Sequence, residues 1–193
     1  MPPVTLATLP SIQQHLIVVG TSVRKPLNIL RPYLESLAWQ EVPPQTAVRY
    51  VFVPDFAPDQ KDAEDYLREW LKERDGIVLR GVPAPVQDFS DSHAVTHQWS
   101  PSAMARVGEN KNRILRWAVQ NNADAVFLAD ADLILDTTTL SALVAVDRPI
   151  VTAVYWTYWH RQGYETREIH AAPQVWLRHP YGLDGRGMEE WEF

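Results

Sequence analysis

The sequence predicts an α/β fold in which a mainly parallel central sheet is flanked by helices. Short apolar runs rich in β-branched residues alternate along the chain with segments of helical periodicity, an order typical of a parallel sheet covered on both faces. Hydrophobic residues make up 46% of the 193 residues, which is enough for one core. The chain has no cysteine, so neither a disulfide framework nor a thiolate site is available.

Five runs are predicted to be buried strands, because each is short, apolar and followed by a turn-forming or polar segment. They span residues 16–19, 48–53, 77–79, 125–129 and 150–156. The segments between them have apolar residues at helical spacing and predict helices over residues 27–39, 59–74, 107–121 and 137–146. Pro32 is expected near the first turn of its helix, where proline is tolerated. Asp136 or a threonine hydroxyl is expected to cap the last helix.

The same spacing predicts which side chains the second and third helices bury. On the second helix the buried side carries Tyr66, Leu67, Trp70 and Leu71. On the third helix it carries Ile114, Leu115, Ala118 and Val119. Residues 81–103 contain several prolines and little periodicity, which predicts a long loop that is either functional or a plain surface excursion.

Charge and hydropathy exclude several classes of protein. The formal net charge of -6 argues against a general nucleic-acid binder, which carries a basic face. Nowhere does the chain have the roughly 18 consecutive apolar residues that a membrane span needs, and its N-terminus lacks the pattern of a signal peptide. With no cysteine present, these features predict a soluble, cytoplasmic protein.

Polar residues follow three of the predicted strands. In an open α/β sheet, ligands bind beyond the carboxyl ends of the strands, so these residues are candidates for one binding site. They are Thr21, Ser22 and Arg24 after the first strand, Asp55 after the second, and Asp130 and Asp132 after the fourth.

Asp130 and Asp132 are two residues apart, and strand alternation would point both side chains to the same side. Mg²⁺ and Mn²⁺ favour oxygen ligands and often bind one or two carboxylates together with substrate phosphates. A metal held there could clamp a diphosphate as it leaves. The alternative is a pair of aspartates that forms a turn or caps a helix.

The order of several motifs resembles family-two glycosyltransferases. Residues 32–40, Pro-Tyr-Leu-Glu-Ser-Leu-Ala-Trp-Gln, resemble the first helix of that family, which commonly ends in Ser-Leu-x-x-Gln. Asp55 occupies the place of the family's acidic residue after the second strand. Lys111-Asn112 stands where the family has Arg-Asn, and Asp130-Ala131-Asp132 matches its Asp-x-Asp triplet. The resemblance covers residues 16–156.

This resemblance implies a GT-A fold, a nucleoside-diphosphate sugar donor, a divalent metal (Mn²⁺ or Mg²⁺) and an inverting transfer to a hydroxyl. Asp55 with Thr21 or Ser22 would hold the nucleoside, and Lys111 and Asn112 would contact the donor. The two aspartates of the triplet would hold the metal and the diphosphate, with Asp132 as the main catalytic position. Arg24 is a further candidate for binding the donor.

The second half is expected to serve the acceptor. An inverting enzyme needs a general base, and Glu189, Glu190 and Asp184 are candidates, although exposed acidic residues near a chain end are an alternative. His170 is a candidate third metal ligand, since neutral imidazole suits Mn²⁺, or a surface histidine. Trp156, within the aromatic run 155–159, would stack on a sugar or pack in a core.

The whole chain, residues 1–193, is thus predicted to be one glycosyltransferase domain of the GT-A type. Residues 16–135 would form the nucleotide-sugar half, and residues 136–193 a shortened or truncated acceptor half. The acceptor class stays open between a glycan, a small molecule, a protein and a lipid carrier, with DNA disfavoured by the acidic charge. Two other functions stay open: a sugar-phosphate nucleotidyltransferase, and a nucleotide-sugar or carbohydrate-binding module without catalysis.

Overall fold

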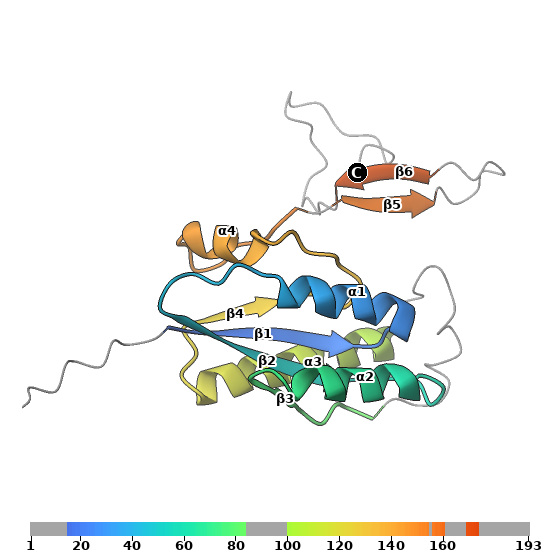
Figure 1. The fold of residues 1–193 in the computed structure, drawn as a ribbon. Helices are drawn as coiled ribbons and strands as arrows, with labels where there is room; N and C mark the ends of the chain where they lie inside the picture. The colour runs from blue at the N-terminus through green and yellow to red at the C-terminus, as the bar shows by residue number, and fades with distance from the viewer. Residues whose placement is uncertain (1–14, 84–99, 155, 161–168, 174–193) are drawn as a thin grey trace, which may run out of the picture. The chain divides into compact units, whose positions relative to one another are not determined.

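The computed structural model describes residues 15–83, 100–154, 156–160 and 169–173 (Figure 1). These belong to two compact units, Met1–Ala145 and Val146–Phe193. The boundary between these units lies at the end of the last helix, ten residues beyond the boundary predicted between the two halves at residue 135, and the single domain stays a prediction.

The first unit is built on a four-stranded, fully parallel sheet. Its strands are β1 (His15–Val23), β2 (Thr46–Pro54), β3 (Gly76–Val78) and β4 (Ala125–Leu128), in the order β3-β2-β1-β4. The register sets Gly20 of β1 beside Val51 of β2 and Leu128 of β4. This sheet confirms the predicted α/β fold class and four of the five predicted strands.

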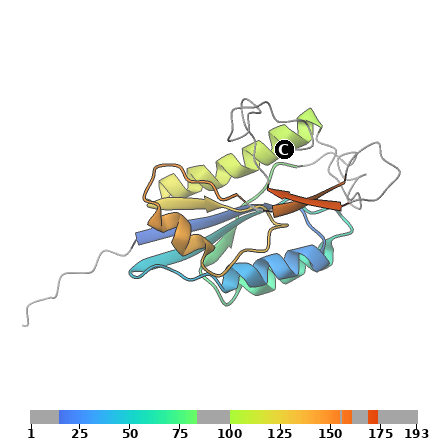
Figure 2. The ribbon, with the colours of Figure 1, turned by 90° about the horizontal axis from the view of Figure 1, so that it is seen from above.

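Helices cover both faces of this sheet (Figures 1 and 2). Helices α1 (Leu27–Ala38) and α2 (Lys61–Leu71) lie on one face, and α3 (Pro101–Gln120) lies on the other. The short helix α4 (Thr139–Ala145) follows β4. Within the described parts of the chain, no helix is both long and apolar enough to cross a membrane.

The core has two layers because successive strand residues point to opposite faces of the sheet. Val19 and Phe52 pack with α1 and α2, whereas Val18 and Val51 pack with Ile114 of α3. All five side chains are buried. Burial on both faces explains why the strands are continuous apolar runs rather than alternating ones.

Helix α3 begins at Pro101, whereas the periodicity predicted residue 107. Its start has a proline in the first turn and a serine cap, with the Ser100 side chain accepting a hydrogen bond from the backbone N–H of Ala103 at 3.1 Å. The expected loop over residues 81–103 is therefore wrong at its end. The remainder of that loop, residues 84–99, lies outside the described residues.

The buried side of α3 also differs from the prediction. Leu115 and Val119 are 39% and 76% exposed. The residues that face the sheet follow each other at intervals of four: Arg106, Asn110, Ile114 and Ala118. The apolar pattern identified only the two members nearest the core, because the other two are polar and lie toward the carboxyl edge of the sheet.

Two smaller predictions are also corrected. Pro32 is the sixth residue of α1, not part of its first turn, so the helix continues through a position that donates no backbone hydrogen bond. Residues 151–154 of the predicted fifth strand have no regular structure, and Ile150 and Val154 are 91% and 60% exposed. An apolar run without a partner to cover it does not form a buried strand.

The second unit contains an antiparallel pair of strands, β5 (Trp156–His160) and β6 (Ile169–Pro173). Trp156 pairs with Pro173, and Trp159 pairs with His170. The fifth strand thus begins where the predicted one ends, and it belongs to a separate sheet.

In the first unit, just before α4, the predicted capping residue Asp136 accepts hydrogen bonds from the backbone N–H and the hydroxyl of Thr138. These hydrogen bonds hold the pKa of the Asp136 carboxyl below its ordinary value.

Candidate functional site

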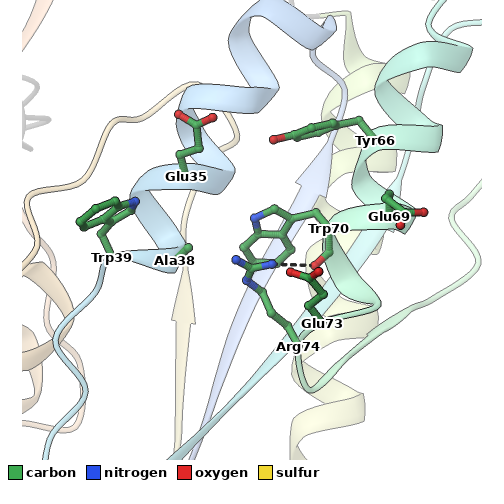
Figure 3. Close-up of a pocket in the computed structure, with 8 residues that line it drawn as sticks. All are labelled: Glu35, Ala38, Trp39, Tyr66, Glu69, Trp70, Glu73 and Arg74. Atoms are coloured by element: carbon green, nitrogen blue, oxygen red, sulfur yellow. Dashed lines mark hydrogen bonds between the residues drawn. The ribbon is translucent and has the colours of Figure 1, made fainter.

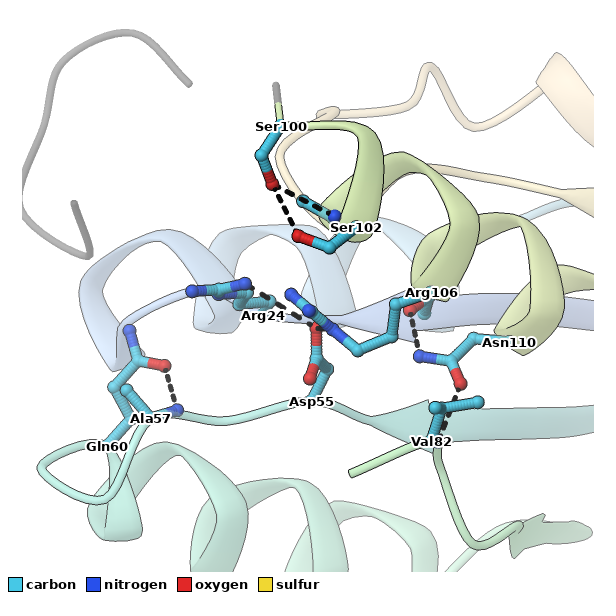
Figure 4. A network of polar contacts seen from close by, with 11 residues as sticks. Arg24, Asp55, Ala57, Gln60, Val82, Ser100, Ser102, Arg106 and Asn110 are labelled. Atoms are coloured by element: carbon cyan, nitrogen blue, oxygen red, sulfur yellow. Dashed lines mark hydrogen bonds and ion pairs between the residues drawn. The ribbon is translucent and has the colours of Figure 1, made fainter. Parts of the chain in front are cut away.

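Asp55 lies directly after β2, at the carboxyl edge of the sheet, and its side chain is only 3% exposed. Arg106 of α3 donates a hydrogen bond from Nε to the Asp55 carboxylate at 3.1 Å. A second guanidinium, that of Arg24 in the β1–α1 loop, lies 3.8 Å away. Figure 4 shows the carboxylate between these two arginines. A buried charge needs such pairing, so this edge of the sheet is electrostatically organised around Asp55.

Asn110 joins three elements at the same edge. Its amide nitrogen donates to the Ser22 hydroxyl at 3.2 Å, and its carbonyl oxygen accepts from the backbone N–H of Val82 at 3.0 Å (Figure 4). The residue is completely buried. It therefore fixes the distance from α3 to the end of β1 and to the segment after β3.

Thr21 is also buried, and its hydroxyl forms a short hydrogen bond with the Tyr33 hydroxyl of α1. Burial raises the pKa of Tyr33 above its ordinary range. Both hydroxyls are thus used inside the protein. Of the two hydroxyl residues predicted to hold the nucleoside together with Asp55, the half-buried Ser22 is better placed for a ligand than Thr21.

The Asp130-Ala131-Asp132 triplet lies in a turn after β4 rather than in the strand itself. The predicted alternation still holds, because Ala129 and Ala131 are buried while the Asp130 and Asp132 side chains are 57% and 43% exposed. The two carboxylates therefore point outward from the core and are accessible to a ligand.

Each carboxylate of the triplet is paired with its own lysine. Nζ of Lys111, on α3, lies 2.9 Å from Asp130. Nζ of Lys25, in the β1–α1 loop, lies 2.7 Å from Asp132. The predicted donor contact Lys111 is therefore at the triplet, whereas its neighbour Asn112 is exposed and shows no contact there.

The same two elements serve both acidic positions, which makes them one site. In the β1–α1 loop, Arg24 reaches Asp55. Its neighbour Lys25 reaches Asp132. Helix α3 likewise contributes one basic residue to each position. In this described cluster, four basic side chains meet three acidic ones: Arg24, Lys25, Arg106 and Lys111 with Asp55, Asp130 and Asp132.

The triplet offers the donor chemistry that a hard divalent cation requires, since carboxylate oxygens suit Mg²⁺ and Mn²⁺. Among the residues that the structure describes, no group of three or more His, Asp or Glu side chains could hold a metal. The two aspartates could therefore hold one only with further ligands, and phosphate oxygens supply such ligands in many magnesium sites. On this basis the residues fit a metal that binds together with a phosphate.

The remaining site predictions concern the second unit. His170 and Trp156 lie in β6 and β5, and each stays a prediction as a metal ligand and a sugar platform. Glu189, Glu190 and Asp184 lie outside the described residues.

Sequence reasoning missed three residues of the site. Arg106 and Asn110 could have been found by extending the buried face of α3 backward from Ile114 in steps of four. Lys25 follows the predicted Arg24, but nothing in its local sequence indicates that it turns toward Asp132.

A separate hollow of about 300 Å³ lies between the ends of α1 and α2 (Figure 3). Trp39, Glu35 and Glu73 are among the residues that line it. On the α2 side, the Arg74 guanidinium lies 4.1 Å from the centre of the Trp70 ring. The helix ends there lead into the starts of β2 and β3, so this hollow is at the amino edge, opposite the site described above.

No family model and no curated protein matches the chain. One similar solved structure is the crystal structure of S. aureus TarS, with a TM-score of 0.40 and 18% sequence identity. The alignment covers 68% of this chain and 19% of the TarS chain. An overlap of that size does not assign a function.

Proposed function

We propose that the chain is a glycosyltransferase that moves a sugar from a nucleoside-diphosphate donor to an acceptor hydroxyl. The observation that carries this proposal is the joining of Asp55 and the Asp130–Asp132 pair at one sheet edge by basic residues of two shared elements. A nucleoside and a diphosphate are chemically distinct parts of one ligand. The buried position at Asp55 and the exposed position at Asp130 and Asp132 suit these two parts of the ligand.

The exposed position suits the diphosphate. Asp130 and Asp132 would hold a Mn²⁺ or Mg²⁺ ion, which when bound neutralises charge on the leaving diphosphate. Lys25 and Lys111 lie at the same carboxylates and would donate hydrogen bonds to phosphate oxygens. These lysines thereby place positive charge where negative charge develops as the glycosidic bond breaks.

The buried position suits the nucleoside. Asp55 is held rigidly by Arg106 and Arg24, and Ser22 is held by Asn110. The half-buried Ser22 hydroxyl would contact a base or ribose directly, whereas Asp55, whose side chain is 3% exposed, would act through the two arginines that it holds in place.

We further propose an inverting transfer with an acceptor site in the second unit. Trp156 would stack on the acceptor sugar, Glu189 or Glu190 would remove the proton of the attacking hydroxyl, and His170 would be a third metal ligand. In this scheme the hydroxyl oxygen forms a bond to the sugar, its proton passes to the glutamate, and the nucleoside diphosphate leaves.

The test uses the full chain, a panel of nucleoside-diphosphate sugars and Mn²⁺ or Mg²⁺, with release of nucleoside diphosphate as the readout. We expect metal-dependent release that Asp132→Ala abolishes and that Asp65→Ala, at an exposed carboxylate of α2, leaves unchanged. Donor binding without release would indicate a binding module instead. Formation of pyrophosphate from a nucleoside triphosphate would indicate a nucleotidyltransferase, and no nucleotide binding at all would overturn the proposal.

A further inference from the structure

We infer that Lys25 and Lys111 are built-in counter-cations that make metal binding and diphosphate binding depend on each other. The inference rests on the proposed function and adds a regulatory property to the same site. It follows from where the two ammonium groups lie: one on each carboxylate of the triplet, at 2.7 and 2.9 Å.

The protein thus supplies its own neutralisation of the triplet. A divalent cation bound to either carboxylate would share it with a lysine ammonium, and like charges sharing one carboxylate repel each other. Water damps this repulsion less at Lys25 and Asp132, which are 16% and 43% exposed, than at Lys111 and Asp130, which are 35% and 57% exposed. The metal alone should therefore bind weakly.

A diphosphate removes this obstacle because its oxygens are alternative acceptors for both lysines. Each ammonium carries three donors on a flexible stem and can turn from a carboxylate to a phosphate by rotating its side chain. The carboxylates then become available to the metal, and the metal in turn neutralises the phosphates. By linkage, each ligand must raise the affinity of the other by the same factor.

Lys25 should contribute more to this coupling than Lys111. Its side chain is less exposed, and its pairing with Asp132 is the shorter of the two. Lys25 also follows Arg24, which forms an ion pair with Asp55. A shift of the β1–α1 loop would therefore change the contacts of both Asp55 and Asp132.

The experiment measures Mn²⁺ affinity of the full chain by electron paramagnetic resonance, without nucleotide and with saturating UDP or GDP. Mn²⁺ with each nucleotide but no protein is the blank. For the wild-type chain we expect nucleotide to raise Mn²⁺ affinity at least about tenfold. Lys25→Met should raise Mn²⁺ affinity without nucleotide about five- to tenfold and lower the coupling, while Lys111 and the direct attraction between metal and phosphate maintain the remainder.

Two variants act as controls, and a third is a further test. Lys25→Arg keeps the charge and should keep the coupling, which separates the role of the cation from a role of the side chain in folding. Lys61→Met removes a lysine paired at 2.7 Å with Asp65 on the exposed side of α2 and should change nothing. Lys111→Met should act as Lys25→Met does, with a smaller effect.

Unchanged Mn²⁺ affinity without nucleotide in folded Lys25→Met, checked by circular dichroism, overturns the inference. That measurement needs no nucleotide, so it is independent of the proposed function. If the wild-type chain transfers sugar while Lys25→Met binds Mn²⁺ as wild type does, the inference alone fails. If Lys25→Met tightens Mn²⁺ binding but neither nucleotide binds, the counter-cation role stands and the donor assignment fails.

Discussion

Asp55 and Arg106 form an ion pair in which both side chains are 3% exposed. Removing one partner of a buried pair leaves an uncompensated charge and typically costs about 3–5 kcal/mol. We therefore expect Asp55→Asn, which keeps the shape but removes the charge, to lower the free energy of unfolding by about that amount in urea titrations. Asp65→Asn, at the exposed pair with Lys61, should change it by less than about 0.5 kcal/mol. A loss below about 1 kcal/mol at Asp55 would contradict the organising role given to this carboxylate.

Tyr33 is expected to make the free energy of unfolding depend on pH. Burial raises its pKa in the folded state, so its contribution to stability is fully present below the unfolded pKa of about 10. Above that pH the unfolded tyrosine ionises first, and the free energy of unfolding falls by up to about 1.36 kcal/mol for each pH unit. Tyr33→Phe cannot ionise, so its free energy of unfolding should fall less steeply between about pH 10 and 11. Parallel slopes for both proteins would show that Tyr33 is not protected in the fold.

Among the elements, α3 depends on close packing against β1 at Gly20. A Cβ at this glycine would overlap Cγ2 of Ile114 and lie 3.3 Å from Leu128. Gly20→Ala should thus lower the free energy of unfolding by about 1–3 kcal/mol. Ile114→Ala in the same chain should relieve part of that strain, giving a double-mutant coupling of at least about 0.5 kcal/mol.

Gly108 is the matched control for this contact. It lies in α3, the helix that contains Ile114, and a Cβ added to it would meet nothing within 4 Å. Alanine is the better helix former by about 1 kcal/mol, so Gly108→Ala should stabilise the protein by up to that amount. If both alanine substitutions had the same sign, the effect at Gly20 would not come from packing against Ile114.

Whether an element could be predicted from the sequence depended on whether its buried residues are apolar. β1 and β2 were predicted because strands buried on both faces are apolar throughout. Helix α2 was predicted because its buried side forms an apolar stripe at helical spacing. The start of α3 was missed because its first turns bury Arg106 and Asn110, which periodicity of apolar residues cannot detect. The predicted fifth strand failed for the opposite reason: Ile150 and Val154 are apolar but exposed.

For the whole molecule, the division into two units predicts that binding and transfer can be separated. Among the residues whose burial is described, every buried apolar side chain lies between Ile17 and Leu140, and the candidate site lies entirely within the first unit. A fragment of residues 1–145 should therefore unfold cooperatively and still bind a nucleoside diphosphate with Mn²⁺, though less tightly than the full chain, because it lacks the proposed metal ligand His170. It should not transfer sugar, because the proposed acceptor residues are absent.

Circular dichroism, calorimetric binding and the nucleotide-release assay measure these three properties on the fragment and the full chain side by side. A fragment that folds but does not bind would show that the second unit completes the donor site. A fragment that transfers sugar at the full rate would remove the acceptor role from residues 146–193.

The sequence by itself determined the parallel α/β layout, because burial on two faces imposes apolar runs and helical stripes that are local in the chain. It also placed Asp55, Asp130 and Asp132 at strand ends, since strand order along the chain is enough to put those ends at one edge. Only the tertiary structure decided which cation meets which carboxylate, that Thr21 is bonded to Tyr33, and that Lys25 and Lys111 occupy the triplet. Such pairings join residues far apart in the chain, and they depend on distances that no local pattern encodes.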